Sequence, residues 1–420
     1  MRRTGFLIPT VKETAQKVEM ISHQRMLQLG MIAQVASGLY SWLPLGLRVL
    51  NKVAQVVREE QNNAACQEVL TPLAQPLSLW EESGRADAYG KELLTMQDRH
   101  DNTLLFSPTG EEMMISIFSR YLKSYKDMPQ CFYQIQWKFR DEIRPRHGVM
   151  RSREFLMKDA YAFDVSPEAA LERYYQMVQC YMQTFDRLGI TCIPVKADSG
   201  PIGGNYSHEF VALCDTGEST VYCSEELLGM VQDYQKHNPK KLLDHAGHSD
   251  GYDASLNWEE KRGIEVGHIF YFGDKYSKDI AMFQGSDNTR IPFEMGSYGI
   301  GISRVVAALI ECYNDDKGVA WPEEVAPFKV CLVALGMQDE KVSAWAEEVY
   351  AYLTERGVDL LYDDRSVGTG RKLGDAELLG SPYIFIIGSQ GASNKTVEIR
   401  NRATGEVQHV TCESAWKVCA

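Results

Sequence analysis

The chain has 420 residues, of which 44% are hydrophobic and 24% are charged, and its formal net charge is −13. This length suffices for two or three domains with hydrophobic cores, and the composition is that of an ordinary globular protein without a run of eighteen apolar residues that could span a membrane. The acidity argues against non-specific coating of nucleic acid, but it leaves room for a local basic cluster that binds phosphate.

The chain shows the signs of a cytoplasmic protein. Its first residues, Met1–Arg3, look like the start of a signal peptide, but no apolar core or small-residue cleavage site follows. The ten cysteines form no CxxC pair and mostly lie in apolar surroundings, which predicts buried free thiols. We therefore expect an unprocessed protein in a reducing compartment, the cytoplasm.

The first predicted elements are helices and strands that alternate up to residue 121. An amphipathic helix is predicted from apolar residues at helical spacing, Leu47, Leu50, Val53, Ala54 and Val57. A strand over 66–71 follows and is stopped by Pro72, and residues 78–92 are expected to form a charged loop region. A second strand at 103–106 leads through SPTGEE into a helix over 113–121. On this pattern alone, Thr109 and Glu111 are residues at a helix N-terminus, where acidic side chains are favoured.

Residues 131–163 are the most informative stretch. Apolar residues alternate with polar ones, which predicts a half-buried strand whose apolar face is Tyr133, Ile135, Trp137 and Phe139. A loop follows with the basic residues Arg144, Arg146, His147, Arg151 and Arg153, and then an apolar run over 155–163. The pattern predicts an antiparallel hairpin with a cationic tip. Arginine binds phosphate oxygens bidentately, so the tip suits a polyphosphate or a nucleic-acid backbone. A solvated basic hairpin is an equally good interpretation of this stretch alone.

The segment after the hairpin combines a helix with a polar stretch. Ser166 and Pro167 are the N-cap and first residue of a predicted helix that ends near Gly189. Residues 223–262 are polar and are expected to be irregular. Within them, His245 and His248 form an HxxH motif, for which a polar loop is favoured over a metal site. No metal held by protein side chains alone is predicted.

A glycine-rich stretch precedes the last helix of this part of the chain. Core strands are expected to resume at 264–272, and MGSYGIGISR, residues 295–304, then leads into a helix over 302–313. The spacing G-x-x-G-x-G, with no βαβ unit after it, is not a dinucleotide fingerprint. Glycines let a nucleotide approach the backbone, and a helix N-terminus with Arg304 in its first turn favours an anionic phosphate.

The C-terminal part alternates strands and helices after a linker at 321–327. Strands are predicted at 329–334, 358–362, 383–387, 396–400 and 407–411, and helices at 340–356 and 371–379. This order predicts a small mixed sheet covered by helices. The sequence GTGRK does not satisfy the P-loop pattern.

Several of these stretches resemble one family. RPRHGVMRSREFLMKDAY, which follows the Arg-x-Glu at 140–142, resembles motif 2 of the class II aminoacyl-tRNA synthetases, and in particular that of prolyl-tRNA synthetases of bacterial type. The upstream order of helix, strand and proline resembles motif 1, which builds the dimer interface of this class, and MGSYGIGISR resembles motif 3. Residues 20–43 and 202–210 and the sequence GHIFYFGDKYS are similar to the catalytic domain of the same family, and GTGRKLGDAELLGSPYIFIIG is similar to a class IIa anticodon-binding domain.

The resemblance implies an ATP site. Arg140 would bridge the α-phosphate and the amino-acid carboxylate, and Glu142 would accept a hydrogen bond from the adenine amino group. Arg151 would hold the outer phosphates, Phe155 would stack on adenine, and Arg304 would bind the γ-phosphate. Arg140 and Arg304 are thus the implied catalytic residues.

The resemblance also implies a site for L-proline. Thr109 and Glu111 would bind the ammonium group, because a carboxylate paired with a hydroxyl suits a secondary ammonium. The other residues of the site would be Arg140, Met157, Asp159, His268 and Ser297. Glu209 would pair with the cationic loop, and assistance to a magnesium ion on ATP is the alternative. The chain departs from the family pattern at Ser107, His147 and Ser297, where the family usually has Thr, Phe and Cys.

The implied architecture has two domains. Residues 1–325 would form an α+β catalytic domain, an antiparallel class II synthetase sheet with helices, and 326–420 a C-terminal α/β anticodon-binding domain with a mixed sheet. Residues 223–262 would be a reduced remnant of the insertion that edits alanyl-tRNA. The implied enzyme is a homodimeric prolyl-tRNA synthetase that uses ATP and Mg²⁺ to form prolyl-adenylate and transfers prolyl to the 3′ end of tRNA(Pro).

Three further expectations follow from this resemblance. Without an editing domain, a separate protein acting in trans would clear alanyl-tRNA(Pro). An enzyme of the same fold for another amino acid, such as threonine, would need zinc-ligating Cys and His, which the sequence lacks. A catalytically inactive paralogue would have lost Arg140, Arg304 or the C-terminal domain, and all three are present.

Overall fold

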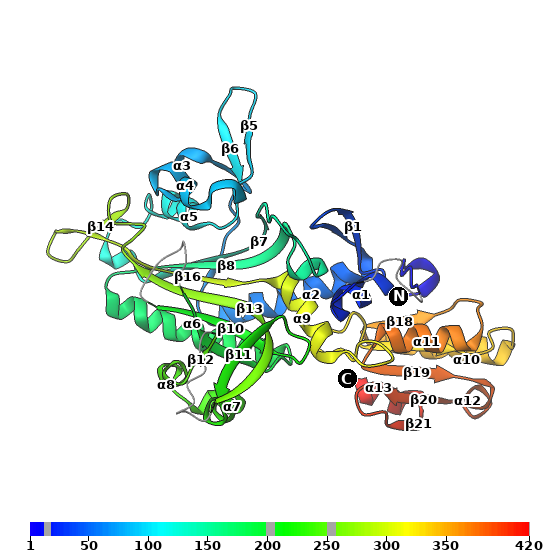
Figure 1. Cartoon of the computed structure of the whole chain (residues 1–420). Helices are drawn as coiled ribbons and strands as arrows, with labels where there is room; N and C mark the ends of the chain where they lie inside the picture. The colour runs from blue at the N-terminus through cyan, green and yellow to red at the C-terminus, as the bar shows by residue number, and fades with distance from the viewer. Residues whose placement is uncertain (12–17, 199–205, 250–257, 420) are drawn as a thin grey trace. The chain divides into compact units, whose positions relative to one another are not determined.

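The computed structural model describes residues 1–11, 18–198, 206–249 and 258–419 (Figure 1). The chain divides into two compact units. The larger unit comprises residues 36–40 and 53–308, and the smaller unit comprises 1–35, 41–52 and 309–420. No helix in the described ranges is both long and apolar enough to cross a bilayer.

The larger unit is built on a nine-stranded sheet in the order β10-β9-β12-β11-β13-β16-β8-β7-β3, with a further pairing of β10 to β13. Its strands are β3 (Gln67–Glu68), β7 (Gln130–Phe139), β8 (Glu154–Asp164), β9 (Cys192–Lys196), β10 (Tyr206–Leu213), β11 (Ser219–Ser224), β12 (Gly247–His248), β13 (Trp258–Gly273) and β16 (Glu294–Ile300). All neighbours are antiparallel except the short pairs β3–β7 and β12–β9. The antiparallel class II sheet predicted for this part of the chain is confirmed.

The expected hairpin is present as β7 and β8, which pair from Gln130↔Phe163 to Phe139↔Glu154. The prediction that β7 is only half-buried is wrong. Lys138 and Gln134, on its polar face, are fully buried, as is Tyr133 on the opposite face. The Tyr133 hydroxyl donates to Asn62 of helix α2 (Pro44–Asn63) at 2.8 Å. The polar side chains are buried because Lys138 and Gln134 both contact a buried carboxylate of β8, that of Asp159.

Helix α6 (Pro167–Arg187) covers the other side of this sheet (Figure 1). The Ser166 side chain accepts from the Ala169 amide, so the expected N-cap is confirmed. The apolar stripe of α6 packs on β8, β13 and β16 through Tyr174, Met177, Tyr181 and Phe185, all with no exposed surface. Burial of this stripe removes large aromatic surfaces from water and holds the central strands flat against the helix.

The polar stretch after β11 is more ordered than expected. Residues 225–249 form α7 (Glu225–Gln232), α8 (Pro239–Asp244) and β12. Leu227, Met230, Leu242 and Leu243 are buried, so the expectation of an irregular segment is wrong for these residues. Its many polar residues hid two short helices whose apolar positions are few and mostly buried. Beyond it, β13 is one strand of 16 residues rather than two shorter ones.

A smaller layer of short elements lies next to the β7–β8 hairpin (Figure 1). It contains a three-stranded sheet, β4 (Ala74–Pro76), β6 (Thr103–Phe106) and β5 (Thr95–Gln97), with helices α3 (Leu77–Glu82), α4 (Arg85–Tyr89) and α5 (Glu111–Phe118). The expectation of a loop over 78–92 is therefore wrong. Helices α3 and α4, which lie in this stretch, are under two turns long and too short to show helical periodicity. They form because Trp80 packs into a small core with Leu93 and Leu105. The strands β14 (Met282–Gln284) and β15 (Arg290–Pro292) form a separate ribbon.

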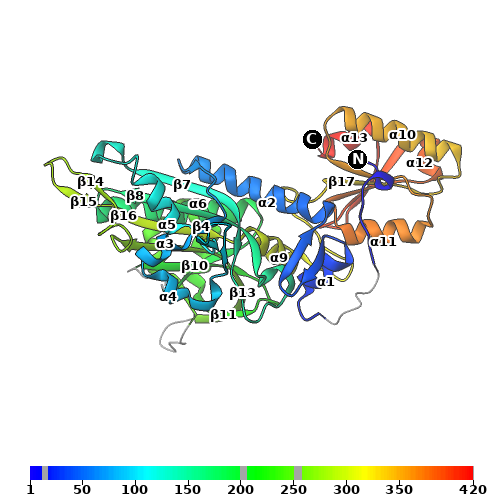
Figure 2. The ribbon, with the colours of Figure 1, turned by 90° about the horizontal axis from the view of Figure 1, so that it is seen from above.

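The smaller unit contains a five-stranded mixed sheet in the order β18-β17-β19-β20-β21. Its strands are β17 (Val330–Ala334), β18 (Leu360–Asp363), β19 (Tyr383–Ile387), β20 (Thr396–Asn401) and β21 (Val407–Thr411), of which the first three are parallel. Helices α10 (Glu340–Glu355), α12 (Ser389–Asn394) and α13 (Cys412–Cys419) lie on one face and α11 (Thr369–Leu379) on the other (Figure 2). The predicted mixed sheet is confirmed.

The remaining elements are α1 (Ile21–Gln28), β1 (Ile32–Ala36), β2 (Leu39–Trp42) and α9 (Ile302–Tyr313). The N-terminal residues pack on the sheet of the smaller unit, where the Tyr362 amide donates to the Met1 carbonyl at 2.8 Å and Arg2 binds Glu347 at 2.6 Å. In α9, the helix that follows the glycine-rich stretch, the Ser303 hydroxyl accepts from the Leu156 amide of β8 at 2.8 Å. This bond ties the start of the helix to the central strand.

Candidate active site

A cavity of about 830 Å³ opens on the polar face of the large sheet. Its walls include all eleven residues that the sequence singles out for ATP or proline: Thr109, Glu111, Arg140, Glu142, Arg151, Phe155, Met157, Asp159, His268, Ser297 and Arg304. The structure thus gathers into one cavity residues that are spread over almost 200 positions of the chain. Their individual roles stay predictions.

The strand register explains how these side chains meet. Asp159 of β8 lies opposite Gly299 of β16, and Gly299 lies opposite His268 of β13. Glycine at the central position leaves room above the sheet between the two functional side chains, and Met157 is the nearest side chain to it. Met157 and Asp159 are two residues apart on one strand, so they face the same side, as expected.

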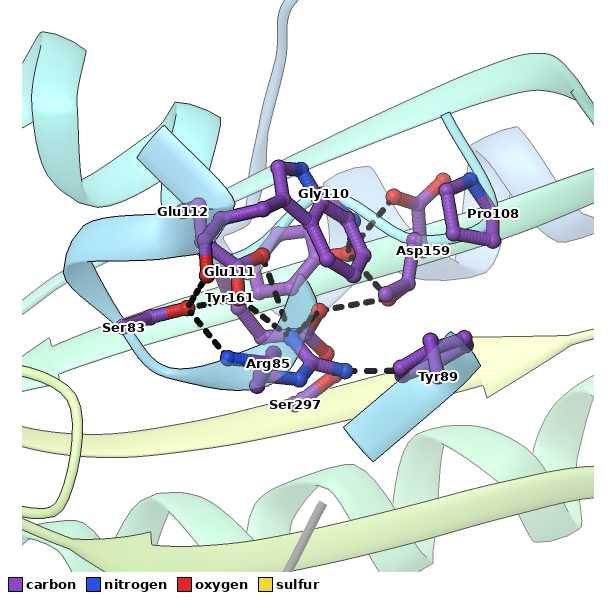
Figure 3. A network of polar contacts seen from close by, with 12 residues as sticks. Ser83, Arg85, Tyr89, Pro108, Gly110, Glu111, Glu112, Asp159, Tyr161 and Ser297 are labelled. Carbon is purple, nitrogen blue, oxygen red and sulfur yellow. Dashed lines mark hydrogen bonds and ion pairs between the residues drawn. The ribbon is translucent and has the colours of Figure 1, made fainter. Parts of the chain in front are cut away.

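At one end of the cavity, Glu111 is the centre of a buried polar network (Figure 3). Its Oε2 accepts from the Thr109 hydroxyl at 2.6 Å and from Arg85 Nη1 at 3.0 Å, and its Oε1 accepts from the Ser297 hydroxyl at 3.1 Å. Burial disfavours the charged form, but the Arg85 guanidinium and the Thr109 hydroxyl outweigh it and lower the pKa of Glu111. This end of the cavity therefore presents a fixed negative charge.

A second carboxylate, Asp159, lies beside it. Asp159 Oδ2 accepts from Gln134 Nε2 at 2.9 Å and from the Tyr161 hydroxyl at 2.8 Å, and it lies 3.0 Å from Lys138 Nζ. Its other oxygen, Oδ1, is buried and has no hydrogen-bond partner among the described residues. Buried carboxylate oxygens are normally paired, so Oδ1 is an unsatisfied acceptor in a residue that lines the cavity.

Arg85 is a site residue that the sequence did not reveal. It lies at the start of α4, in the stretch expected to be a loop, and only 3% of it is exposed. The sequence signal for a buried cation was indirect. Two adjacent carboxylates, Glu111 and Glu112, begin a helix whose next residues are apolar, and a buried pair of carboxylates requires a cation. Nothing local identified which basic residue would supply it.

The middle of the cavity is formed by the end of β7. The Arg140 guanidinium donates to the Pro108 carbonyl at 3.3 Å and lies 5.3 Å from the centre of the Phe155 ring. Arg140 thus adjoins the Thr109–Glu111 loop on one side and the expected adenine platform on the other. Its neighbours Glu142 and Arg151 bind each other at 2.9 Å, and hydrogen bonds from the Arg144 amide and from Arg151 lower the pKa of Glu142.

Another part of the cavity wall combines a cation with carboxylates. Arg304 Nη1 donates to Glu265 Oε2 at 3.0 Å, and Glu265 Oε1 lies 3.5 Å from His268 Nδ1. Desolvation raises the pKa of Glu265, but the hydrogen bond from His268 and the charge of Arg304 outweigh it and lower the pKa to about 2. Glu209 lies 4.0 Å from His268 Nδ1, and its pairing with the cationic loop stays a prediction. Glu209, Glu265 and His268 each offer one ligand atom within 4.8 Å of one another.

Glu265 was missed because of a β-bulge. In the β10–β13 pairing, Phe210 lies opposite Gly267 and Val211 opposite Glu265, so Val266 is an extra residue on β13. Residues three apart on a regular strand face opposite sides, but the extra residue turns Glu265 and His268 to the same side. The sequence GHIFYFGDKYS carries no mark of this bulge. Residues 202–205 of the expected active-site strand lie outside the described residues.

Comparisons with known proteins agree with this architecture. Residues 94–313 match the model of the tRNA synthetase class II core domain (G, H, P, S and T), and residues 329–420 match that of the anticodon binding domain. Solved prolyl-tRNA synthetase structures from Cryptosporidium parvum share the fold. One, complexed with L-proline and AMP, has a TM-score of 0.77 and 18% identity over 97% of this chain and 78% of that chain.

Relatives of closer sequence span the whole chain. A proline–tRNA ligase from Rickettsia bellii is 49% identical over 98% of this chain and 96% of the relative. One from Agrobacterium fabrum is 47% identical over 99% of both. The sequence-based assignment is confirmed: the chain belongs to the family of proline–tRNA ligases, with a class II synthetase core followed by an anticodon-binding domain.

Proposed function

We propose that the chain activates L-proline with ATP to prolyl-adenylate and pyrophosphate and transfers prolyl to the 3′ end of tRNA(Pro). One observation carries the proposal. A single cavity is lined by the buried carboxylates Glu111 and Asp159 and by arginines, and one of these, Arg140, lies between the Thr109–Glu111 loop and the Phe155 ring. The carboxylates suit an ammonium group and the arginines a polyphosphate, and these are the groups that the two substrates of amino-acid activation carry. The names of the bacterial relatives support the choice of proline.

The proposed chemistry is one of positioning. The proline carboxylate attacks the α-phosphorus of ATP in line with the departing pyrophosphate, and little covalent chemistry is asked of the protein. Thr109 and Glu111 hold the secondary ammonium, whose two N–H donors match a hydroxyl and a carboxylate, and Asp159 Oδ1 offers a further acceptor. Met157, His268 and Ser297 surround the ring.

The arginines act on the charge that moves during the reaction. Arg140 binds both the α-phosphate and the attacking carboxylate, and so stabilises negative charge where it is redistributed in the transition state. Arg304 neutralises the γ-phosphate, Arg151 the outer phosphates, and Phe155 stacks on adenine while Glu142 accepts from its amino group. Each of these side chains borders the same cavity.

Magnesium would enter with ATP. Carboxylate oxygens are the ligands that Mg²⁺ prefers, and Glu209 and Glu265 supply two of them beside Arg304. Bound there, the ion would neutralise phosphate charge.

The domain and assembly proposals rest on the sequence resemblance and on one edge of the large sheet. We retain a catalytic domain at 1–325 and an anticodon-binding domain at 326–420, in a cytoplasmic homodimer. The strand of the motif 1 region, β3, is the last strand of the nine-stranded sheet, and Leu70 just beyond it is 77% exposed. An unpaired edge with an exposed leucine suits burial against a second subunit. The compact α7–α8 segment would not edit, and a separate protein would clear alanyl-tRNA(Pro) in trans.

The decisive experiment is pyrophosphate exchange measured with each of the twenty amino acids. Exchange that depends on proline supports the proposal. Exchange that depends on threonine instead, or no exchange with any amino acid, contradicts it.

A second experiment tests the proline site. Glu111→Gln removes the charge that faces the ammonium group and should raise the KM for proline far more than the KM for ATP. Glu225→Gln is the matched control, because Glu225 is also the first residue of an eight-residue helix but is exposed. If Glu111 only stabilises a helix start, both substitutions cost about 0.3–1 kcal/mol of stability and leave the proline KM unchanged.

A further inference from the structure

A single buried arginine faces the carboxylate that we assign to the amino-acid ammonium group. Arg85 Nη1 donates to Glu111 Oε2 at 3.0 Å and to both oxygens of Glu112, at 2.9 and 3.1 Å (Figure 3). Its Nη2 donates to the Tyr89 hydroxyl at 3.2 Å. The guanidinium carbon also lies 5.0–5.2 Å from the ring centres of Trp80, Tyr89 and Tyr276. The aromatic cage and the two carboxylates fix the guanidinium in one place.

We propose that Arg85 is a positioning residue for amino-acid selection: it holds Glu111 ionised and correctly oriented, and so sets the range of pH over which the site binds a cationic substrate. Arg85 does not line the substrate cavity, and it acts through Glu111. The inference rests on the proposed function.

The cluster of Arg85, Glu111 and Glu112 contains more acidic groups than basic ones. Glu111 and Glu112 supply two negative charges and Arg85 one positive charge, all in residues no more than 5% exposed. Lys275 lies nearby but is exposed to solvent, which weakens its effect. While both carboxylates are ionised, one negative charge is therefore left over in a buried place, and a cationic ligand would balance it.

The structure assigns that surplus charge to Glu111. Burial and the neighbouring Glu111 charge raise the pKa of Glu112 despite Arg85, whereas Arg85 and Thr109 lower the pKa of Glu111. The two carboxylates also face different spaces. Glu111 lines the substrate cavity, and Glu112 lines a separate cavity of about 140 Å³ with Ser83 and Tyr276. When the cluster takes up a proton, Glu112 accepts it, and Glu111 stays charged toward the substrate.

The two carboxylate oxygens of Glu111 have different hydrogen-bond partners. Oε2 is held by Arg85 and Thr109, while Oε1 is bonded by Ser297, a residue of the predicted proline pocket. A carboxylate anchored through one oxygen cannot rotate away from the cavity. The titratable and charged groups around Glu111 are Arg85 and Tyr89 of α4, Glu112 of α5, Asp159 and Tyr161 of β8, and Lys275 and Tyr276 after β13.

Removal of the arginine charge should change how the KM for proline depends on pH. Without Arg85, burial raises the pKa of Glu111 against the Thr109 hydrogen bond alone among its side-chain partners that lower it, because the ionised form loses its counter-charge in a fully buried position. Below the new pKa the neutral carboxyl no longer attracts the ammonium group, and the KM for proline rises about tenfold for each pH unit. The sign is fixed: the loss grows as the pH falls and disappears as it rises.

The test is proline-dependent pyrophosphate exchange between pH 6 and pH 9 with the full-length enzyme. Arg85→Gln should raise the proline KM with a steep increase toward low pH, while the ATP KM stays within about twofold of wild type. The double variant Arg85→Gln/Glu111→Gln should have a high proline KM without this pH dependence, because the carboxyl that faces the ammonium group is no longer there to titrate. Arg99→Met, in an exposed turn of the same small layer, is the matched control and should behave as wild type.

Arg85→Lys covers the case in which the glutamine variant does not fold. Its ammonium retains the charge, but it lacks the second nitrogen that bonds Tyr89 and the planar group that packs among Trp80, Tyr89 and Tyr276, so it orients Glu111 less firmly. We expect a proline KM three- to tenfold above wild type, no added pH dependence and an unchanged ATP KM. An unchanged proline KM in Arg85→Lys, or a proline KM in Arg85→Gln that rises equally at all pH values, overturns the proposal. Absence of proline-dependent exchange in the wild type would instead overturn the proposed function.

Discussion

Replacing Lys138 with methionine tests how strongly the large sheet depends on its buried ion pair. Lys138 Nζ lies 3.0 Å from Asp159 Oδ2, and the two side chains are 0% and 3% exposed. The substitution keeps the length and apolar stem of the side chain but removes the charge. Loss of one partner of a buried pair typically costs about 3–5 kcal/mol, because the other charge is left without compensation.

The structure places the expected value at the low end of that range. Asp159 Oδ2 keeps two donors after the substitution, Gln134 Nε2 at 2.9 Å and the Tyr161 hydroxyl at 2.8 Å. We therefore expect a loss of about 3 kcal/mol in the free energy of unfolding of the larger unit. For a unit of this size, that corresponds to a fall of about 6–12 °C in its melting temperature.

The assay is a double-mutant cycle of Lys138→Met and Asp159→Asn, followed by calorimetry so that the transition of each unit is resolved. The double variant should be more stable than Lys138→Met alone, because no charge is then left unpaired. Lys126→Met, an exposed lysine just before β7, is the control and should change stability by less than about 0.5 kcal/mol. A coupling energy below about 0.5 kcal/mol between Lys138 and Asp159 would refute the reasoning.

Three further predictions concern activity, pH and editing. Arg140→Ala should lower the rate of pyrophosphate exchange several hundred-fold, which corresponds to about 3–4 kcal/mol. Arg144→Ala, in the exposed loop, should leave the rate unchanged. A rate for Arg140→Ala within a few-fold of wild type would contradict the role of Arg140. Burial raises the pKa of Asp164 from 3.8 to about 6, so its ionisation opposes folding as the pH rises from 4 to 6. The gain in melting temperature from Asp164→Asn should therefore grow over that window and correspond to on the order of 3 kcal/mol above it. A gain that does not depend on pH would contradict this prediction. Alanine is smaller than proline and loses only about 1–3 kcal/mol of binding per missing methylene, so the enzyme should form alanyl-tRNA(Pro) and leave it intact; hydrolysis of pre-formed alanyl-tRNA(Pro) above the rate without enzyme would contradict this.

The parts of the fold that were predictable are those with a strong local pattern. The β7–β8 hairpin, the capped helix α6 and the mixed C-terminal sheet each follow from a period of two, an N-cap with proline, or alternation of strands and helices. The resemblance to a known family supplied what periodicity could not, namely which residues from distant segments share a cavity. Helices α3 and α4 were missed because their stability comes from the packing of Trp80 rather than from their own sequence.

The site details that were missed depend on contacts between distant segments. Lys138 looks like an exposed strand residue until Asp159 is placed beside it, 21 positions later in the chain. Glu265 faces the cavity only because of the bulge at Val266, which is a property of the pairing with β10. Arg85 reaches Glu111 from a separate helix, and nothing in its local sequence reveals this. In each case the chemistry of the residue was visible, but its partner was not.

The pairing of β11 with β13 has a consequence for how this family can change over time. Ser224 and Trp258 lie opposite each other in that pairing, where β11 ends and β13 begins, and the described residues between them contribute the two-residue strand β12 to the sheet. Neighbouring strands are about 4.8 Å apart, so whatever lies between these residues starts and ends at almost the same place. The cost of closing such a loop grows only slowly with its length, and the register of the strands around the cavity does not depend on it. A folded module could therefore be gained or lost beside β12 in a single genetic event, and the pairings of β13, β16, β8 and β7 around the cavity would keep their alignment.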